Sequence, residues 1–503
     1  MDRLKIYEVP QGAVKNRDFR IRLRTRGGSW QEAEAYKIRI EMHHVSEASM
    51  VYFDFSGGVE CEITSLRETV RSVEIRPASK RVRFRQKGDT ITFFLTEPAK
   101  LSVEINGDRF HNLHLMAGEA EMYFNSLKED DKRIFLEGGK LVHPEEAWAL
   151  WEENEEPLEE VISLEGVSVH DPEALLERLK RVGQGAVLHF GPGMHYIKGA
   201  VFDVPSHVQI QIDGGAFVLG SFRITNEQYV SVTGRGIIYL GFLKKETYLR
   251  GVEVNKSAHV LVKGVTILSP THNIIHLGSV YDILIDDVRG FSHVGWSVGI
   301  NMMACENVMI KDVFIRSSDD CITVYGRRYE YLGDSDNVQI KSSVLWADVA
   351  HPTNIGVHGD SGNGGNVIQD VLFEDIDILE HHEPQDEYLG CLCINAGDGN
   401  TVRNVTYKNI RVEQFERGKL LDIQVKWNKR YNPIPGQWVE HVVLENVSYT
   451  GKGEFTSEIC GYDEKRRVVD VRFRNLTVRG HHVLAPQEGN IHVGEFAEGI
   501  IFE

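Results

Sequence analysis

One short pattern recurs through most of the chain after Gly193 and restricts the folds open to it. Asn, Asp or His precedes a Val, apolar residues then fill every second position, and the unit returns after roughly 20 to 35 residues. The pattern is carried by HVQIQIDGGAFVLG (from His207), HVLVKGVTI (from His259), YDILIDDVRGF (from Tyr281), ENVMIKDVFI (from Glu306), DNVQIKSSVLW (from Asp336), VIQDVLFEDIDI (from Val367), VRNVTYKNIRV (from Val402), VEHVVLENVSY (from Val439) and VVDVRFRNLTV (from Val468). Apolar residues at every second position indicate half-buried strands, and strands that return at such a period indicate a coil of parallel strands, a β-helix.

The same repeat predicts how each rung of the coil is built. Apolar side chains point into the coil, and each rung stacks on the next about 4.8 Å away. Asn and Asp at the corners suit tight turns, because their side chains bond to the nearby backbone. The blades of a β-propeller are the competing repeat, but blades are spaced more uniformly and are richer in Trp-Asp signatures. We therefore predict an all-β chain with a parallel β-helix.

The first part of the chain carries a different pattern. Strand-period segments FRIRLRTR (from Phe19), YKIRIEM (from Tyr36), MVYFDF (from Met50) and RVRFRQ (from Arg81) alternate with glycine-containing turns. Short strands with no helices between them predict an antiparallel β-sandwich over residues 1–125. No catalytic constellation stands out in it.

A connector and one helix separate the two β regions. The acidic run at residues 152–156 indicates a connector over residues 126–165, with a short helix near residues 145–151. A helix with Asp171 as N-cap, Pro172 in its first turn and Gly183 at its end follows, with Ala174, Leu175, Leu176 and Leu179 as its apolar stripe. Such a helix can cap the open end of a coil, so we assign residues 166–503 to the β-helix domain.

Composition narrows the function classes. The formal net charge is -18 with no basic block, which argues against a nucleic-acid or anionic-membrane partner. The six cysteines are scattered without the spacing of a zinc site, so we expect reduced thiols and no bound metal. The N-terminus has no apolar run, so we expect no secretory leader and no membrane helix. A cytoplasmic location follows as the prediction. A leader removed from the chain would instead imply an extracellular protein.

Two adjacent carboxylates interrupt the repeat in one rung. Strand alternation stops at Ser317, Asp319 and Asp320 follow, and an apolar strand resumes at Cys321. Within one regular strand the two carboxylates would face opposite ways, whereas at a bend both can face one cleft. Two close carboxylates repel, so one tends to hold its proton while the other is ionised, as general acid/base hydrolysis requires. A lone Asp-Asp pair is more often a solvated turn.

Further polar residues break the repeat in the rungs that follow, and stacking would bring them into one groove. They are Trp346, Asp348, His351, Asn354, His358 and Asp360 in the next rung, and His381, His382, Glu383, Asn395 and Asp398 in the rung after it. A single His is usually a surface residue, but a cluster beside a carboxylate pair favours a site. For Trp346, Tyr325 and Trp427, stacking on a sugar ring and packing in the core are equal alternatives. The stretch at residues 426–438 is long enough to wall one end of a groove.

The segment from Ser269 to about Asn409 resembles glycoside hydrolase family 28, the polygalacturonase-like β-helix hydrolases, and more distantly the dextranase family of the same fold. SDDCITV (from Ser318) is similar to the family's D-D-C-I-A-I, and SPTHNI (from Ser269) to its SP-x-W. AHPTNIGVHG (from Ala350) resembles G-H-G-I-S-I-G, while WSVGIN (from Trp296) and CIN (from Cys393) stand where N-T-D-G-I-D and R-I-K would. The resemblance implies a right-handed parallel β-helix, and the preceding β-sandwich resembles the layout of dextranase-type relatives.

The resemblance also implies an inverting glycosidase that cleaves an α-glycosidic bond in a pectic or neutral oligosaccharide or polysaccharide, with no cofactor. Asp319 would be the general acid, Asp320 would activate or orient water, and His351 would support the acid. Inversion requires carboxylate functions about 6.5 to 9.5 Å apart. The candidate substrate-binding residues are Tyr325, Arg327, His358, Asp360, Glu383, Asn395 and Trp427.

Two departures from the family pattern bear on the chemistry. The carboxylate of N-T-D-G falls on Val298, so either Asp320 alone is the base, or Asp360, His358 or Glu383 has taken over, or catalysis is weakened or lost. The cations of R-I-K are Cys393 and Asn395, which favours a neutral oligosaccharide or a different uronic-acid linkage over polygalacturonate.

Three alternatives to a hydrolase stay open. A carbohydrate-binding protein without turnover would explain Val298. A polysaccharide lyase would need a Lys or Arg base such as Arg327 or Arg328, and an acidic calcium cluster that the sequence does not present. A purely structural β-helix would need neither the Asp pair nor the histidines.

Overall fold

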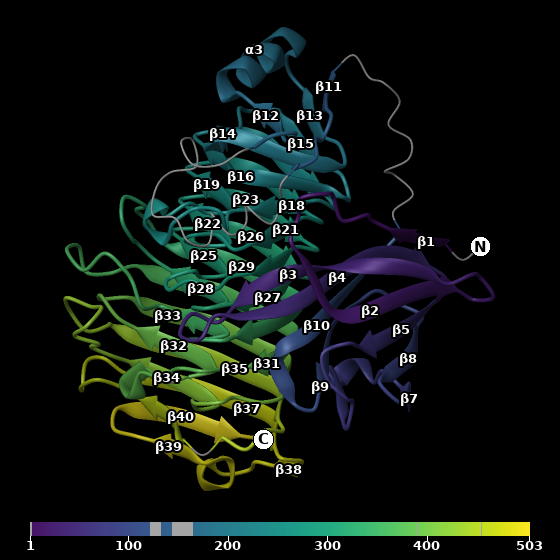
Figure 1. Ribbon diagram of the computed structural model, residues 1–503. Helices are drawn as coiled ribbons and strands as arrows, with labels where there is room; N and C mark the ends of the chain where they lie inside the picture. Colours follow the sequence, from purple (N-terminus) through teal and green to yellow (C-terminus); the bar gives the residue numbers. More distant parts are fainter. Residues whose placement is uncertain (1–2, 121–131, 143–163, 389, 454) are drawn as a thin grey trace.

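The computed structural model describes residues 3–120, 132–142, 164–388, 390–453 and 455–503. This part of the chain is nearly all β-structure, with a 10-stranded sheet in the N-terminal domain and a 30-stranded coil after it (Figure 1). The predicted right-handed parallel β-helix and the β domain before it are confirmed. The helix and the acidic run expected at residues 145–156 lie outside the described residues. No helix in the described ranges is long and apolar enough to cross a membrane.

The N-terminal sheet runs in the order β6-β9-β10-β4-β3-β2-β5-β8-β7, with β1 paired to β4. Its strands are β1 (Arg3–Ile6), β2 (Lys15–Thr25), β3 (Gln31–Ile40), β4 (Ser46–Ser56), β5 (Val59–Ser65), β6 (Val73–Arg76), β7 (Phe84–Lys87), β8 (Thr90–Leu95), β9 (Ala99–Ile105) and β10 (Asp108–Glu119), with one 3-10 turn, η1 (Ala78–Lys80). All pairs are antiparallel except β10 with β4. Strands distant in this order, such as β5 and β9, share one apolar core, so the sheet folds over on itself.

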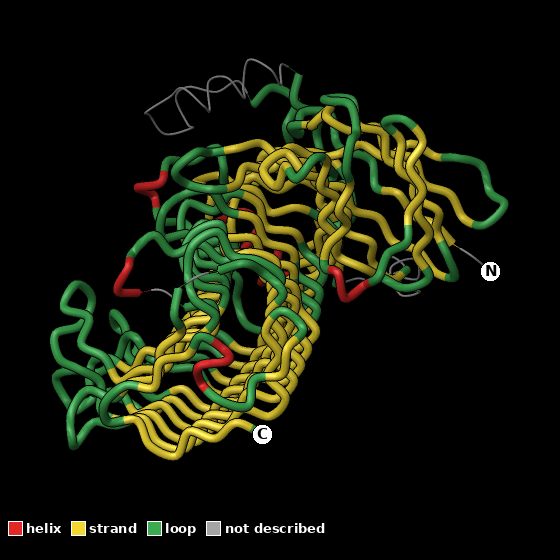
Figure 2. The backbone as a smooth tube through the Cα atoms, turned by 90° about the horizontal axis from the view of Figure 1, so that it is seen from below, coloured by secondary structure: helices red, strands yellow, loops and turns green. Residues whose placement is uncertain are grey.

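The β-helix has three faces, each a stack of parallel strands. The first sheet contains β11 (Arg133–Leu136), β13 (Val187–Phe190), β15 (Gln209–Ile212), β17 (Gln228–Gly234), β20 (Ala258–Lys263), β23 (Tyr281–Asp286), β26 (Glu306–Lys311), β40 (Ala497–Phe502) and the first halves of β29 (Ser335–Ala347), β31 (Val367–Glu380), β33 (Thr401–Val412), β35 (Trp438–Tyr449) and β37 (Val468–Val478). Figure 2 shows the stacked strands wrapping around the interior.

The second sheet lies on the side of the N-terminal domain. It contains β12 (Ser168–His170), the first halves of β14 (Gly193–Asp203) and β16 (Ala216–Thr225), β18 (Ile237–Tyr239), β21 (Thr266–Leu268), β24 (Arg289–Phe291), β27 (Phe314–Ser317) and the second halves of β29, β31, β33, β35 and β37, to which β38 (His481–His482) adds.

The third sheet is the one that bears the candidate site. It contains the second halves of β14 and β16, then β19 (Val252–Asn255), β22 (Ile275–Gly278), β25 (Ile300–Met303), β28 (Ile322–Tyr325), β30 (Thr353–Ile355), β32 (Leu392–Ala396), β34 (Leu421–Val425), β36 (Ser457–Cys460) and β39 (Ile491–Val493). The remaining short turns are η3 (Lys245–Thr247), η4 (Asp386–Tyr388) and η5 (Pro486–Gly489).

Packing inside the coil and hydrogen bonds at its corners follow the repeat. The alternating apolar residues form one continuous buried cluster along the coil. At one corner Asn307 and Asn337 adopt left-handed backbone conformations, with φ of 55° and 51°. The Asn337 side chain donates to Asn307 Oδ1 at 2.7 Å. Asn tolerates this conformation because its short side chain can bond locally. The bond at this corner links the side chains of adjacent rungs, whereas the sequence predicted bonds from the side chain to nearby backbone.

The predicted helix is present as α3 (Pro172–Val182) and covers one end of the coil (Figure 1). Asp171 accepts from the backbone N–H groups of Glu173 and Ala174, and Leu175 and Leu179 are buried against the coil. One strand, β11, falls within the residues 126–165 that the sequence analysis assigned to a connector. It pairs in parallel with β13, so the coil begins before residue 166.

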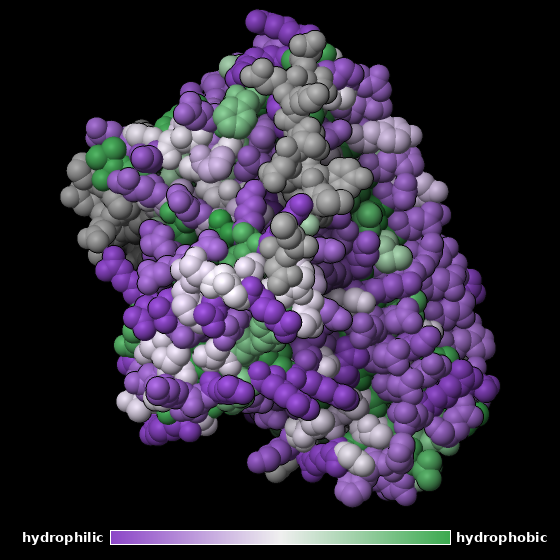
Figure 3. Space-filling view, turned by 90° about the vertical axis from the view of Figure 1, so that its right-hand side faces the viewer, coloured by the Kyte–Doolittle hydropathy of each residue, from purple (hydrophilic) through white to green (hydrophobic). Residues whose placement is uncertain are grey.

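The N-terminal domain packs on the second sheet through a largely apolar interface. The coil contributes Met194, Tyr196, Phe217, Leu219, Ile237, Tyr239, Leu268, Phe291, Phe314, Trp346 and Leu379, and the N-terminal domain Tyr36, Ile38, Ile40, Met50, Tyr52 and Met116. Burying each large side chain stabilises the contact by about 1.5–3 kcal/mol. The molecular surface on this side is mostly hydrophilic, with scattered apolar residues (Figure 3). The apolar outer face of the second sheet is therefore buried in this interface.

The third sheet presents one continuous row of mostly polar residues to the outside of the coil. Register pairs them from rung to rung in the order Asp203, Arg223, Glu253, His276, Asn301, Thr323, Asn354, Cys393, Asp422, Glu458 and His492. Side chains of a strand alternate between its two faces, and the neighbouring positions point into the apolar core. The carboxylate pair lies beside this row, in the turn that leads into β28.

Candidate active site

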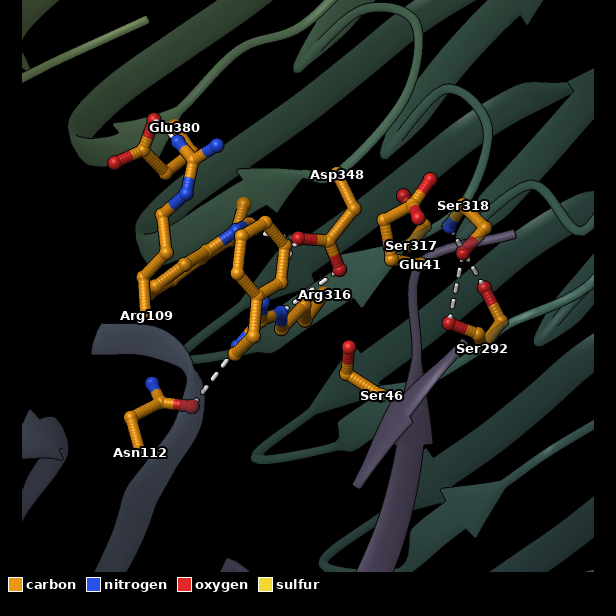
Figure 4. A network of polar contacts seen from close by, with 12 residues as sticks. Glu41, Ser46, Arg109, Asn112, Ser292, Arg316, Ser317, Ser318, Asp348 and Glu380 are labelled. Carbon is orange, nitrogen blue, oxygen red and sulfur yellow. Dashed lines mark hydrogen bonds and ion pairs between the residues drawn. The ribbon is translucent and has the colours of Figure 1, made fainter. Parts of the chain in front are cut away.

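The two carboxylates lie in the bend between β27 and β28, as predicted. Asp320 is 5% exposed, and Asp319 is half-buried. The backbone N–H of Asp320 donates to Asp319 Oδ1 at 2.8 Å, and Ser317 Oγ donates to the Asp319 carbonyl at 2.6 Å. Ser318 is bonded to Ser292 of the preceding rung through its N–H and its hydroxyl, each at 3.1 Å (Figure 4). The bend is therefore held by hydrogen bonds within it and to the preceding rung.

His351 lies next to Asp320 in the following rung. Pairing of Ile322 with Thr353 brings the two turns together. His351 donates to Asp320 Oδ1 from its backbone N–H at 3.1 Å and from Nδ1 at 2.6 Å, and its Nε2 lies 2.5 Å from the Tyr388 carbonyl. Burial acts to lower the pKa of His351, but the Asp320 charge and these hydrogen bonds outweigh it and raise the pKa to about 9. With acceptors at both ring nitrogens, His351 is an imidazolium.

The other oxygen of Asp320 is also bonded. Asn354 Nδ2 donates to Asp320 Oδ2 at 2.8 Å, and the hydroxyl of Tyr325 donates to the same oxygen at 3.2 Å. A carboxylate has about four acceptor positions, and here all four are used. Burial acts to raise the pKa of Asp320, yet the His351 charge and the donors lower it. Asp320 is thus an ionised carboxylate with no acceptor position left for water.

Asp319 carries the opposite protonation state. Burial, and next the negative charge of Asp320, raise the pKa of Asp319 to about 7. One of its oxygens accepts only the Asp320 N–H, and its side chain reaches the surface. A protonated and an ionised carboxyl in one bend are what general acid catalysis requires.

Val298 lies in the rung before Asp319. Gly299 N–H donates to the Asp320 carbonyl and Ile300 N–H to that of Cys321, each at 2.8 Å, and this register places Val298 next to Asp320. Its side chain is 6% exposed and apolar. The register thus places no carboxylate at the position that the family motif would fill.

Five of the predicted substrate-binding residues lie in the rung of the pair or in the next two rungs. The ring of His358 meets the ring of Tyr325 edge-on at 5.0 Å, and burial lowers the pKa of His358 well below its usual value. Arg327 is ion-paired with Asp360 at 2.7 Å. Glu383 is 1% exposed and lies behind His351, 3.9 Å from its Nε2, so it supports the imidazolium and does not face a substrate.

The other two predicted residues lie further along the third sheet and beside it. Asn395 projects from β32 with Oδ1 unpartnered among the described residues, and its Nδ2 lies 2.6 Å from Cys393 Sγ. Trp427 is 37% exposed and donates from Nε1 to the Asn432 carbonyl at 3.0 Å. Neither has a hydrogen bond to Asp319, Asp320 or His351 in the described chain.

Two residues of the expected groove face the other way. Trp346 is fully buried under the N-terminal domain, so packing is its role, and Asp348 forms a two-point ion pair with Arg316. The reason is that the second half of β29 belongs to the second sheet, whose outer face the N-terminal domain covers. His381 is buried as well, with Nδ1 2.7 Å from the Ala350 carbonyl.

Sequence reasoning missed Tyr388 and the full role of Asn354. Asn354 Nδ2 donates to Tyr388 Oη at 2.9 Å as well as to Asp320. Asn354 faces outward in the same row as Thr323, and strand register could have assigned it. Tyr388 reaches the site through the turn η4, and no sequence signal marks it.

Arg328 was considered only as a lyase base. It lies over the rings of Tyr325 and Tyr329, 5.6 and 5.0 Å from their centroids. It has no ion pair among the described residues, and its charge contributes to lowering the pKa of His272, His276 and His358 after burial. The histidines near this cation are therefore neutral, and Arg328 is the uncompensated charge beside the carboxylate pair.

Two segments cover the third sheet on either side of this site. Upstream, Tyr331 lies on Gly278 and donates to Asn255 Oδ1 at 2.8 Å, bordering a pocket of ≈ 550 Å³ lined by Arg223, Arg250, Glu253 and Tyr329. Downstream, residues 426–438 lie across β30 and β32. Asn432 Nδ2 donates to the Val357 carbonyl at 2.7 Å, and the ring of Tyr431 lies 5.4 Å from that of Tyr388. The exposed length of the third sheet is thus limited at both ends.

The six cysteines are free thiols, five of them buried. The described residues contain no group of three or more His, Cys, Asp or Glu that could hold a metal ion.

Comparisons with known proteins bear on this geometry. Residues 242–489 match the family described as glycosyl hydrolases family 28. The chain is 25% identical over 278 residues to a protein named probable rhamnogalacturonase C of Aspergillus niger, which covers 47% of this chain and 58% of the relative. The chain thus spans little more than half the length of that curated relative.

Two solved structures share the fold. Dex49A from Penicillium minioluteum is similar with a TM-score of 0.61 at 12% identity, over 97% of this chain and 96% of that one. A family 28 exopolygalacturonase of Yersinia enterocolitica is similar with a TM-score of 0.50 at 11% identity, over 88% of this chain and 96% of that one. The resemblance predicted from the motifs is confirmed over residues 242–489, which include the carboxylate pair and His351.

Proposed function

We propose that this chain, in which residues 242–489 resemble glycosyl hydrolases family 28, is a glycoside hydrolase that cleaves an α-glycosidic bond with Asp319 as the general acid. The observation that carries the proposal is the Asp319–Asp320 pair in one bend with His351 bonded to Asp320, an arrangement that raises the pKa of Asp319 and lowers that of Asp320. Asp319 donates its proton to the glycosidic oxygen as the bond to the leaving sugar breaks. A positioned acid of this kind contributes about 10²–10⁴-fold to the rate.

Asp320 is a poor candidate for the base. Its acceptor positions are filled by His351, Asn354 and Tyr325. Its role in this proposal is electrostatic, because its charge keeps the proton on Asp319. Val298 cannot accept a proton, and Glu383 is buried behind His351.

His358 is the group that we assign as the base. It is neutral, its side chain is 17% exposed, and its ring borders that of Tyr325. Asp398 lies 3.9 Å from its Nδ1 and can orient and stabilise the protonated ring. As a neutral imidazole, His358 would take the proton of an attacking water, and direct displacement by that water inverts the anomeric carbon.

An acidic sugar is the substrate class that we propose. Cys393 and Asn395 leave β32 without a cation, but Arg328 supplies one near Tyr325. A carboxylate would satisfy Arg328 with charge-assisted hydrogen bonds. A pectic linkage also accords with the name of the rhamnogalacturonase relative.

We further propose exo action on short chains. Tyr331 upstream and residues 426–438 downstream limit the exposed third sheet, so a long polymer has no open groove to lie in. A series of products of mixed lengths from a polymer would contradict exo action.

The test is a reducing-sugar assay on a panel of acidic and neutral glycans with the wild type and Asp319→Asn. We expect turnover of an acidic glycan that falls by about 10²-fold or more in the variant, and an inverted anomer when fresh product is followed by proton NMR. Retention of configuration would exclude direct displacement, and an unsaturated product that absorbs in the near ultraviolet would indicate a lyase.

A binding protein without turnover is the second candidate. Val298 and the saturated oxygens of Asp320 favour it, because both reduce the supply of a carboxylate base. It predicts that glycans bind to the wild type and to Asp319→Asn alike, and that neither cleaves them.

A further inference from the structure

Arg316 connects the N-terminal domain to the bend that carries Asp319. It is fully buried at the end of β27, three residues before Asp319. Its Nε and Nη2 donate to Asp348 at 2.8 Å each, and its guanidinium lies 3.9 Å from the centroid of the Trp346 ring. Figure 4 shows the side chain of Arg316 between Asp348 of the coil and Asn112 of the N-terminal domain.

The Arg316–Asp348 ion pair joins the two chain segments that lead into the site. Asp348 precedes His351 by three residues, as Arg316 precedes Asp319. The backbone N–H of Asp348 donates to the Ser317 carbonyl at 2.9 Å. A shift of this pair would thus move Asp319 relative to Asp320 and His351, whose charges act on the pKa of Asp319 in opposite directions.

The remaining hydrogen-bond partners of Arg316 come from the N-terminal domain. Its Nη1 lies 3.2 Å from Asn112 Oδ1 and 3.0 Å from His114 Nε2, both on β10 and both fully buried. Asn112 is fixed in turn by its Nδ2, which donates to Ser102 Oγ at 2.7 Å. His114 can only accept at Nε2, because burial and the Arg316 charge keep its ring neutral.

We propose that β10, through Asn112 and His114, positions the catalytic bend by completing the acceptor set of Arg316. The effect on turnover rests on the proposed function, whereas the effect on the bend does not. A buried guanidinium that loses an acceptor must move or admit water. A small displacement of the acid is enough to slow a reaction that depends on its placement.

His114 offers a matched set of variants. Its ring is surrounded by Phe291, Phe314 and Trp346 at 5.1, 5.2 and 5.8 Å, so His114→Phe suits the cavity but removes the acceptor. His114→Gln keeps an oxygen that can reach Arg316. Tyr7→Phe is the control, because Tyr7 donates at 2.5 Å to Asp54, which pairs with Arg235 of the coil at the same interface but away from the bend.

Two measurements separate positioning from general loss of structure. For turnover of the cleaved glycan, we expect His114→Phe to lower kcat about tenfold with KM within about twofold, as for a misplaced acid. His114→Gln should recover most of kcat, and Tyr7→Phe should keep it whatever its melting temperature. Equal losses in His114→Phe and Tyr7→Phe would overturn the proposal.

The second measurement needs no substrate. In protein labelled with 13C at the aspartate carboxyls, the Asp319 signal is the one missing from Asp319→Asn. The midpoint of the Asp319 titration depends on how close Asp319 lies to the charges of Asp320, His351 and Glu383. We expect a lower titration midpoint in His114→Phe and an unchanged one in His114→Gln and Tyr7→Phe. An unchanged midpoint in His114→Phe would overturn the positioning role, and absence of any glycan turnover would overturn only the proposed function.

Discussion

Asp320 accepts two hydrogen bonds from His351, one from the backbone N–H at 3.1 Å and one from Nδ1 at 2.6 Å. Because Nε2 of the same ring faces the Tyr388 carbonyl, the ring carries both protons. The cation keeps Asp320 ionised, and the charge of Asp320 in turn helps to keep the proton on Asp319. The ion pair therefore keeps Asp320 ionised, and the charge of Asp320 adds to burial in raising the pKa of Asp319.

The pH profile should follow Asp319. Its pKa is raised to about 7, so kcat/KM should be highest below pH 7 and fall about tenfold per pH unit above it as the acid loses its proton. Asp320→Asn removes the charge that holds this proton, and we expect the alkaline limb to move to lower pH. Asp370→Asn, the same change at an exposed corner of the coil, is the control. An alkaline limb that stays in place in Asp320→Asn would show that burial alone sets the pKa of Asp319.

Stability should depend on His351 in a particular pH window. Its pKa is raised to about 9 in the folded protein from about 6.5 when unfolded, which corresponds to about 3 kcal/mol. A raised folded pKa gives a contribution that is fully present below pH 6.5 and lost as pH rises through 9. The melting temperature of His351→Asn should thus lie further below that of the wild type at pH 6 than at pH 9.5. His441 is an exposed side chain and is the control. The difference in melting temperature between His441→Asn and the wild type should be the same at pH 6 and pH 9.5.

Arg328 should discriminate acidic from neutral glycans. Hydrogen bonds to a charged group contribute about 1.5–3 kcal/mol, so Arg328→Gln should raise KM for an acidic glycan about tenfold to a hundredfold. A neutral glycan should be unaffected, and Arg328→Lys should recover part of the loss. Arg403→Gln, on the first sheet, is the control for loss of a positive charge. Equal losses on acidic and neutral glycans would mean that Arg328 serves the fold and not recognition.

His358 should behave as the base. We expect His358→Ala to lower kcat by about 10²–10⁴-fold, while the alkaline limb assigned to Asp319 stays in place. His481→Ala, an exposed histidine near the C-terminal end of the coil, should be neutral. Wild-type turnover in His358→Ala would return the search for the base to Asp398 or to Asp320.

The sequence was sufficient for the fold and for the centre of the site. The strand-period repeat requires an apolar interior, and the N-cap and apolar stripe of the helix are local signals, so both could be predicted without tertiary information. The bend at Asp319 is local as well, because alternation stops there. Stacking then brings His351 next to Asp320, since rungs are in register.

Contacts that depend on loops or on the other domain could not be predicted. Tyr388 reaches His351 through a turn whose path no periodicity specifies. Trp346 and Asp348 were expected in the groove, but the side of the coil that they occupy is fixed by packing of the N-terminal domain. The start of the coil at β11 was missed because a short strand in an acidic stretch has little pattern of its own.

The cover that the N-terminal domain places on the second sheet has a consequence for local opening of the coil. Rungs of a solenoid contact only their neighbours and can separate from its ends. The apolar interface spans rungs from Met194 to Leu379, and ion pairs extend it to Glu413 and Glu416. These rungs, with the carboxylate pair among them, should exchange their amide hydrogens as one cooperative unit. From β35 onward no described residue pairs with the N-terminal domain, so these rungs should exchange sooner and leave the bend at Asp319 closed.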